Sequence, residues 1–215
     1  MKFYKIYLDE GKRKKFAEAA TLSKIIGEDI ECTTCNSKWV KSIIERPIKI
    51  ILTRNYLPDY TAILPEQKIV SERMKEIIEQ YSLAKCTFDK IITKTVDQLT
   101  DQQIVDFKME GENISKFCTI PSSYFTINLN AGISIHSDMN VLLHKCEECG
   151  RRNFTKLKEE KSMLLNYILD YSTWNGQDLF TETHFTNLFI CTERFVEICK
   201  LEKITGLGFD EIKVI

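Results

Sequence analysis

Two pairs of cysteines with the spacing Cys-x-x-Cys are the residues of this sequence best suited to chemistry. Cys32 and Cys35 form the first pair, and Cys146 and Cys149 form the second. A tight turn with this spacing places two thiolates on one side of the loop, and two such turns supply four sulfurs, which suits a tetrahedral zinc ion in a closed structural site. We therefore predict one structural zinc ion per chain, with these four cysteines as its ligands.

Two other interpretations of these pairs stay open. A redox Cys-x-x-Cys usually opens a helix after a strand, and neither pair here is followed by a clear helix start. His144 lies two residues before Cys146 and could replace one thiolate. The remaining cysteines lie in apolar surroundings, and we expect them to be reduced core residues: Cys86, Cys118, Cys191 and Cys199.

Composition limits the class of protein. The chain has 215 residues, is 43% hydrophobic and carries a formal net charge of -1. That is enough apolar material for one core, or for two small half-domains that share one. The near-neutral charge argues against a nucleic-acid partner, because phosphate contacts need clustered Lys and Arg.

The opening residues bear on location. Residues 1–8 form a strand-like run that is too short and too polar for a secretory signal, and no stretch approaches the length of a membrane span. We therefore expect a cytoplasmic protein with no membrane partner. In that compartment thiols are kept reduced.

The chain also contains an internal repeat. Residues 70–91 and 191–212 align without a gap at an offset of 121, with seven identities in 22 positions, where ordinary composition gives about one or two by chance. Residues 3–9 match residues 124–130 at the same offset, and the two cysteine pairs are related by an offset of 114. We interpret the chain as a duplication in which each half supplies one cysteine pair. The alternative is that any two strand–helix–strand units look alike.

The repeat predicts the architecture. Each half is expected to contain an opening strand, a Cys-x-x-Cys loop, further strands, a helix and a final strand. Ser71 and Thr192 are the expected N-caps of the two helices, and Ile77 and Ile198 are expected at equivalent buried positions. The predicted fold class is α+β, with two tandem copies of a small strand-rich half-domain, one main helix in each, joined by a shared zinc site. The first half-repeat spans 1–93, a connector spans 94–121 and the second half-repeat spans 122–215.

Residues for catalysis are scarce in this sequence. It has three histidines, His136, His144 and His184, and lacks a nucleophile elbow, a phosphate-binding glycine loop and a His-Glu-x-x-His motif. A four-thiolate site also leaves no open coordination position for a catalytic water. We therefore predict that the protein is not an enzyme. Trp174 is expected to be a half-buried anchor in a turn rather than an exposed recognition residue.

Several short motifs resemble a known family. They are Cys32-Thr33-Thr34-Cys35 followed by Trp39, Cys146-Glu147-Glu148-Cys149-Gly150, and three C-terminal runs at 178–180, 192–195 and 205–207. Together they resemble the double Cys-x-x-Cys-Gly family, which is best known from myxobacterial paralogues and includes immunity proteins against contact-delivered toxins. Asn36 stands where the first motif would have Gly, and Asn also tolerates the left-handed backbone that Gly supplies there.

The resemblance implies a function of the binding class. It implies an immunity protein with no chemistry of its own, whose partner is a cognate protein toxin that the sequence does not identify. The residues themselves leave a second hypothesis open, namely a zinc-knuckle regulatory or nucleic-acid-binding adaptor. The near-neutral charge argues against that adaptor.

Overall fold

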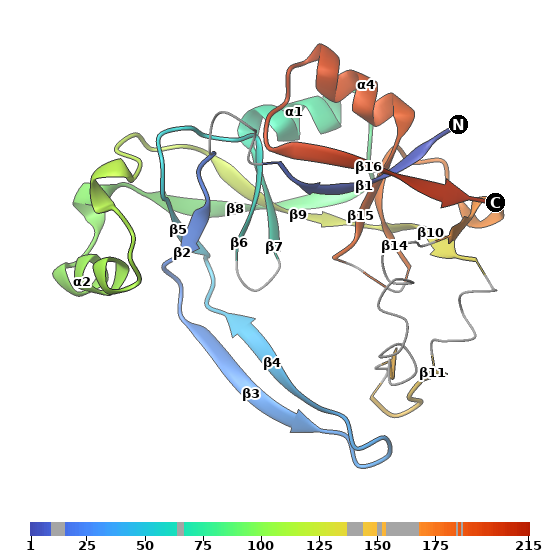
Figure 1. Ribbon diagram of the computed structural model, residues 1–215, viewed down its shortest axis with the longest axis horizontal. Coiled ribbons are helices and arrows are strands. Elements are labelled where there is room, and N and C mark those ends of the chain that lie inside the picture. The colour runs from blue at the N-terminus through green and yellow to red at the C-terminus, as the bar shows by residue number, and fades with distance from the viewer. Residues whose placement is uncertain are drawn as a thin grey trace.

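Strands dominate the architecture. The computed structural model describes residues 1–9, 16–63, 67–136, 144–149, 152–153, 168–183, 185 and 187–215. These strands form two six-stranded sheets and two hairpins, and two helices lie close to each other along one side of the sheets (Figure 1). Within these ranges, the structure has no helix with the length and apolar character needed to span a bilayer.

The first sheet is open and has the strand order β2-β5-β8-β9-β7-β6. Its neighbours are antiparallel except for β5 and β8, which run parallel. The apolar run Ile50-Ile51-Leu52 is fully buried, as expected for a strand covered on both faces. The strands are β2 (Ala19–Thr21), β5 (Lys49–Leu52), β6 (Tyr60–Ile63), β7 (Gln67–Ser71), β8 (Cys86–Lys94) and β9 (Tyr124–Leu129).

The second sheet closes on itself as a barrel with the order β1-β15-β14-β10-β13-β16. β16 completes the ring by pairing antiparallel with β1, and β10–β14 and β13–β16 are its parallel pairs. The strands are β1 (Phe3–Leu8), β10 (Ala131–Ile135), β13 (Ile168–Asp170), β14 (Leu179–Glu182), β15 (Phe189–Thr192) and β16 (Leu207–Val214).

The opening strand of each sequence repeat lies in the sheet of the other repeat. β1 pairs with β15 and β16, and β9 pairs with β7 and β8. The registers agree as well: Phe3 lies opposite Ile212, and Tyr124, its match at an offset of 121, lies opposite Ile91. The two sheets therefore share one pairing pattern in which β1 and β9 have changed places.

This arrangement shows that the predicted fold class is wrong. Two tandem half-domains would each keep their own opening strand, whereas the exchange of β1 and β9 leaves neither repeat with a sheet of its own. One sheet is also a closed barrel, and a third helix, α2 (Asp101–Met109), lies between the repeats. The physical reason is that a short run rich in aromatic and β-branched residues favours an extended strand without specifying its partner.

The helices α1 (Glu72–Gln80) and α4 (Glu193–Leu201) form as predicted. The side chain of Ser71 accepts a hydrogen bond from the backbone N–H of Met74, and Thr192 caps α4 in the same way. Ile77 and Ile198 are both buried, at 7% and 8% exposure. Both helices pack into one apolar cluster with residues of both sheets, so a common core joins the repeats.

A buried carboxylate fixes the start of each of these helices. Asp59 accepts a hydrogen bond of 2.8 Å from the hydroxyl of Ser71 and an ion pair of 3.4 Å from Arg73. Asp178 accepts from the hydroxyl of Thr192 and from Arg194 in the same manner. The helices are therefore held to their sheets by matching polar contacts as well as by apolar packing.

Residues 94–121, predicted to be a connector, contain η1 (Val96–Gln98), α2 and η2 (Ile114–Lys116). The rings of Phe107 and Phe117 lie 5.1 Å apart, edge to face, and pack with Ile51 of the first sheet. The segment is thus anchored by aromatic burial. The predicted boundaries at 93 and 122 stay predictions.

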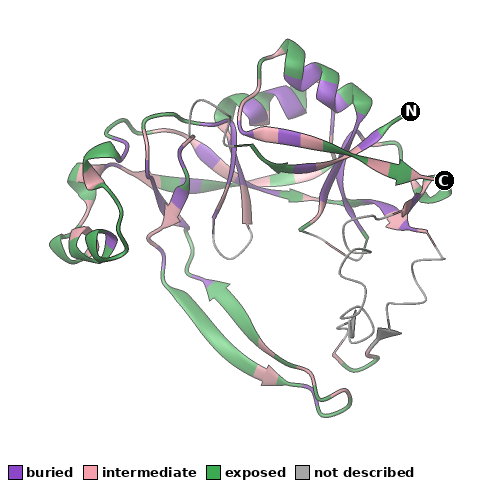
Figure 2. Cartoon of the chain, in the orientation of Figure 1, coloured by how far each residue is buried: buried purple, intermediate pink, exposed green. Residues whose placement is uncertain are grey.

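Two hairpins complete the described structure. The larger is formed by β3 (Ile25–Glu31) and β4 (Lys38–Ile44), and we call it the arm. It extends away from the sheets, and most of its side chains are exposed on both faces (Figure 2). The smaller hairpin is β11 (His144–Lys145) with β12 (Arg152–Asn153), and it lies toward the same side of the molecule as the arm (Figure 1).

Candidate metal centre

The first cysteine pair lies in the turn at the end of the arm. The backbone N–H of Asn36 donates to the carbonyl of Cys32 at 2.8 Å, and the N–H of Cys32 donates to the carbonyl of Ser37 at 3.0 Å. Asn36 has a φ of 53°, which confirms that it adopts the left-handed backbone expected at the position of the missing Gly. We call this turn, residues 32–37, the first knuckle.

The second cysteine pair lies in a turn of the same length. Glu31 pairs with Lys38 across the arm, and Lys145 pairs with Arg152 across the small hairpin, so each turn spans six residues. We call residues 146–151 the second knuckle, of which 146–149 are described. Each knuckle leads into a strand, β4 or β12, rather than into a helix. This geometry disfavours the redox interpretation, in which a helix follows the pair.

The four predicted ligands meet at one point. The Sγ atoms of Cys32 and Cys146 are 3.7 Å apart, as are those of Cys35 and Cys149. All four sulfurs lie within 4.8 Å of one another. Four sulfurs at the Zn–S bond length of about 2.3 Å form a tetrahedron with edges of about 3.8 Å. The arrangement could therefore hold one metal ion, and it is too wide for an S–S bond of about 2.05 Å.

Burial differs among the four cysteines. Cys32 is buried, whereas Cys35, Cys146 and Cys149 are half-buried. The centre thus lies near the surface with one ligand on its inner side.

The protein environment acts differently on the two thiols of the first knuckle. The hydroxyl of Ser37, 3.2 Å from the sulfur, and its backbone N–H favour the Cys35 thiolate and lower the pKa of Cys35 to about 6. The backbone N–H of Cys35 also favours the Cys32 thiolate, but burial and the neighbouring sulfurs raise the pKa of Cys32 to about 12. The thiol of Cys35 therefore ionises readily, whereas the thiol of Cys32 does not. A divalent cation among the sulfurs would favour the thiolate form of all four.

Glu148 is a residue of this site that the sequence analysis missed. It lies between the two cysteines of the second knuckle, yet its carboxylate accepts hydrogen bonds from the hydroxyls of Thr33 and Thr34 in the first knuckle. Its Oε2 is also 3.6 Å from the Sγ of Cys32. Hydrogen bonds from Thr34, Cys32 and Thr33 lower the pKa of Glu148. The sequence did carry a signal for this contact, because hydroxyl donors lie between the cysteines of the first pair and a carboxylate lies between those of the second.

The other residues singled out in the sequence lie elsewhere. Cys118, Cys191 and Cys199 are buried as predicted, and Cys86 is half-buried. Trp174 is half-buried as predicted, with its Nε1–H donating to the carbonyl of Gln177 at 2.9 Å and its ring edge-to-face with Phe3.

Among the described residues, the cluster consists of the four cysteines and includes no histidine. His136 follows β10, and His184 lies outside the described residues. The backbone of His144 lies in β11, but its side chain is outside the described residues, so the alternative in which it replaces a thiolate stays open.

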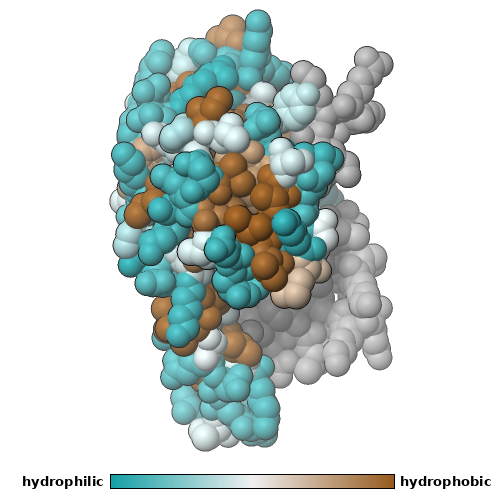
Figure 3. All heavy atoms as spheres, turned by 90° about the vertical axis from the view of Figure 1, so that its left-hand side faces the viewer, coloured by the Kyte–Doolittle hydropathy of each residue, from teal (hydrophilic) through white to brown (hydrophobic). Residues whose placement is uncertain are grey.

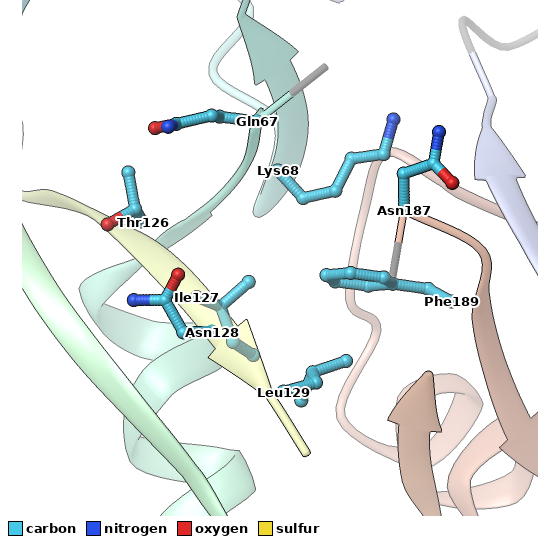
Figure 4. Close-up of a pocket in the computed structure, with 8 residues that line it drawn as sticks. All are labelled: Gln67, Lys68, Thr126, Ile127, Asn128, Leu129, Asn187 and Phe189. Atoms are coloured by element: carbon cyan, nitrogen blue, oxygen red, sulfur yellow. The ribbon is translucent and has the colours of Figure 1, made fainter. Parts of the chain in front are cut away.

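A separate surface pocket of about 340 Å³ lies between the sheets (Figure 4). Among its lining residues that the structure describes, Lys68 carries the one ionisable side chain, and the others are amides, a hydroxyl and apolar groups. This lining offers no pair of nucleophile and base. The lining residues are Gln67, Lys68, Thr126, Ile127, Asn128, Leu129, Asn187 and Phe189.

Comparison of the chain with family models, with curated proteins and with solved structures gives no match. The class of the protein therefore rests on its own residues. At that level it is a strand-rich protein in which two hairpins bring four cysteines into one cluster that could hold a metal ion.

Proposed function

We propose that this protein binds one structural zinc ion through Cys32, Cys35, Cys146 and Cys149, and that it is a cytoplasmic immunity protein that neutralises a cognate protein toxin. The observation that carries the metal site is the close approach of four sulfurs from two knuckles. The toxin partner is supported by the resemblance of the motifs at 32–39 and 146–150.

Zinc is the ion that this ligand set suits best. Four thiolates are soft donors, and a tetrahedral four-thiolate set is typical of structural zinc in a reducing compartment. Four protein ligands leave no open position on the ion, so its role in this proposal is structural and not catalytic.

The proposed role of the ion is to fix the arm. The arm joins the body at the buried Ile44, and the four-cysteine cluster lies at its other end. The side chains between these points are mostly exposed, so they gain little from core packing. An ion shared with the second knuckle would hold the arm at both ends and reduce the entropy lost when a partner binds.

The arm offers a contact surface for that partner. Ile26 and Ile43 lie opposite each other across the two strands and are 51% and 47% exposed. Val40, further along the arm, is 58% exposed, and on the face that Figure 3 shows the lower end of the molecule is mostly hydrophilic. Exposed apolar pairs bordered by polar residues are common at protein interfaces.

Metal content is the first test. Elemental analysis of protein purified without added metal is expected to give one zinc per chain, and Cys146→Ser is expected to lower that value. Cys86→Ser is the matched control, because Cys86 lies in β8 and outside the cluster. A wild-type chain without stoichiometric zinc, or one with a disulfide in either pair, would contradict the metal proposal.

Protection is the second test. Co-expression with the toxin encoded beside the gene should restore cell survival, and Ile43→Glu should weaken complex formation about 10-fold if this side chain is an interface anchor. Val105→Glu on α2 is the control, since Val105 is equally exposed, at 47%, on another element. Survival that does not depend on the protein, with no complex on mixing, would refute the immunity role.

A further inference from the structure

We propose that Glu148 is a positioning residue that clasps the first knuckle and so prepares the four sulfurs for the metal. The inference rests on the proposed metal site, because it assigns a role to a residue that contacts the ligands. In this role Glu148 does not bind the ion. It brings the two knuckles together through the hydroxyls of Thr33 and Thr34.

The contact geometry supports this role. Both carboxylate oxygens of Glu148 lie 3.4 Å from the hydroxyl of Thr33, and Oε2 also accepts from the hydroxyl of Thr34. Glu148 and Thr34 are 114 residues apart in the sequence, so this contact joins two separate hairpins. It connects the centres of the two turns, directly beside the sulfurs.

The two knuckles have complementary side chains for this contact. At the positions between the cysteines, the first knuckle carries two hydroxyl donors, Thr33 and Thr34, and the second carries two carboxylates, Glu147 and Glu148. Glu147 is exposed and has no hydrogen bond to the described part of the chain, whereas Glu148 reaches across. Of the two acidic neighbours in the described structure, Glu148 is therefore the one that contacts the first knuckle.

The clasp affects metal binding through effective concentration. Each cysteine pair alone can supply two ligands, and the second pair must be brought in at an entropic cost that grows with the intervening chain. A contact that holds the knuckles close before the ion arrives removes part of that cost. Losing it should mainly speed release of the ion.

The negative charge of Glu148 acts against the benefit of its hydrogen bonds. A carboxylate close to four thiolates repels them, so the benefit of Glu148 must come from its hydrogen bonds with the two hydroxyls. This separates two substitutions. Glu148→Ala removes the hydrogen bonds, whereas Glu148→Gln keeps an acceptor oxygen for the hydroxyls and removes the charge.

The experiment uses the full chain loaded with Co²⁺ and then with Zn²⁺. Absorption of the cobalt form reports how many thiolates bind the ion, and transfer of zinc to a coloured chelator reports its release rate. Glu148→Ala is expected to release zinc about 5-fold faster, because the hydrogen bonds that join the two knuckles are lost. Glu148→Gln should stay close to wild type, and Glu147→Ala is the matched control and should not differ from wild type.

Further variants identify the partner of Glu148. Thr34→Val should release zinc faster on its own but should add little in the Glu148→Ala background, because the two residues share one interaction. Fully additive effects would overturn the clasp, as would identical release rates for Glu148→Ala and Glu147→Ala. A cobalt spectrum with fewer than four thiolates that changes in Glu148→Ala would show Glu148 to be a ligand, which also overturns it. If no variant and no wild-type protein bound either ion, the proposed metal site itself would be wrong.

Discussion

Arg73 and Arg194 make the same contact in opposite directions between the two repeats. Arg73, in the first turn of α1, donates to the backbone carbonyl of Glu202 at the end of α4. Arg194, in the first turn of α4, donates to the carbonyl of Tyr81 at the end of α1, at 3.2 Å. A cation near a helix C-terminus is favourable, because the last carbonyls there carry partial negative charge. Each helix therefore stabilises the end of the other.

Asp59 and Asp178, which form ion pairs with these two arginines, should differ in their contribution to stability. Asp59 accepts from Ser71, from Arg73 and from both the hydroxyl and the backbone N–H of Thr205, whereas Asp178 accepts from Thr192 and Arg194 in the described structure. We expect Asp59→Ala to lower the free energy of unfolding by about 3 kcal/mol and Asp178→Ala by less, because a larger number of donors lose their acceptor.

Urea denaturation of both variants is the measurement for this comparison. Glu79→Ala is the control, since its ion pair with Lys75 is exposed and should be worth about 0.5 kcal/mol or less. Equal losses for the two aspartates would show that the extra contacts of Asp59 with Thr205 have no energetic weight.

Gly206 should tolerate substitution less well than other glycines with the same backbone. Gly206 and Gly176 have φ values of +86° and +84°, so an added side chain strains both. A Cβ at Gly206 would lie 2.2 Å from the carbonyl oxygen of Tyr60, whereas a Cβ at Gly176 meets nothing within 4 Å. Thermal unfolding should therefore show a loss of about 1 kcal/mol for Gly176→Ala and a clearly larger one for Gly206→Ala. Similar losses would mean that the start of β6 at Tyr60 shifts to make room for the added Cβ.

Stability should fall at alkaline pH because of buried thiols. Burial raises the pKa of Cys199 to about 12 and that of Cys191 well above its ordinary value. Above pH 9, the unfolded chain loses these protons while the native protein keeps them, so the free energy of unfolding falls as pH rises from 9 toward 12. Each such thiol adds a slope that is small at pH 8 and approaches about 1.4 kcal/mol per pH unit well above pH 9.

Denaturation between pH 8 and 10 is the test of this slope. Cys199→Ala should reduce the slope even if it lowers the overall stability, because the variant has one fewer buried thiol. Above pH 10 the buried Tyr60 and Tyr124, whose pKa values burial also raises, should add to the decline. A slope that is unchanged in Cys199→Ala would show that this thiol does not carry the effect.

Metal removal should loosen the arm and leave the sheets folded. The knuckles lie outside the shared apolar core, which both sheets and both helices build without them. Amide hydrogen exchange in the presence of a chelator should therefore speed up across residues 25–44 while the exchange of β8 and β9 stays slow. Loss of protection in β8 and β9 at the same chelator concentration would mean that the ion supports the whole fold.

The two cysteine turns of the cluster were accessible from the sequence because their information is local. The spacing of Cys32 and Cys35 defines a turn, and the same spacing recurs at Cys146 and Cys149. The helix starts at Ser71 and Thr192 were also local, since a cap needs one side chain and the N–H three residues later. The start of α2 was equally readable in the capping box of Thr100 and Gln103, but it was missed.

The arrangement of the strands was not accessible in this way. Phe3 and Tyr124 begin similar apolar runs, and nothing in either run selects the sheet in which it pairs. The role of Glu148 depends on Thr34, which comes within reach only after both hairpins have folded. Partner choice between distant segments is a property of the whole chain, and a single sequence carries little direct signal of it.

The exchange of β1 and β9 has a consequence for synthesis on the ribosome. The first sheet can form once β9 has been made, because all of its strands lie between residues 19 and 129. β1 is made before any of them, but its neighbours β15 and β16 lie at residues 189–214. This strand must stay unpaired with its native neighbours during most of translation, and such long-range pairing is slow. Nascent chains are therefore exposed to mispairing at β1, so this strand is where we would expect a chaperone to bind.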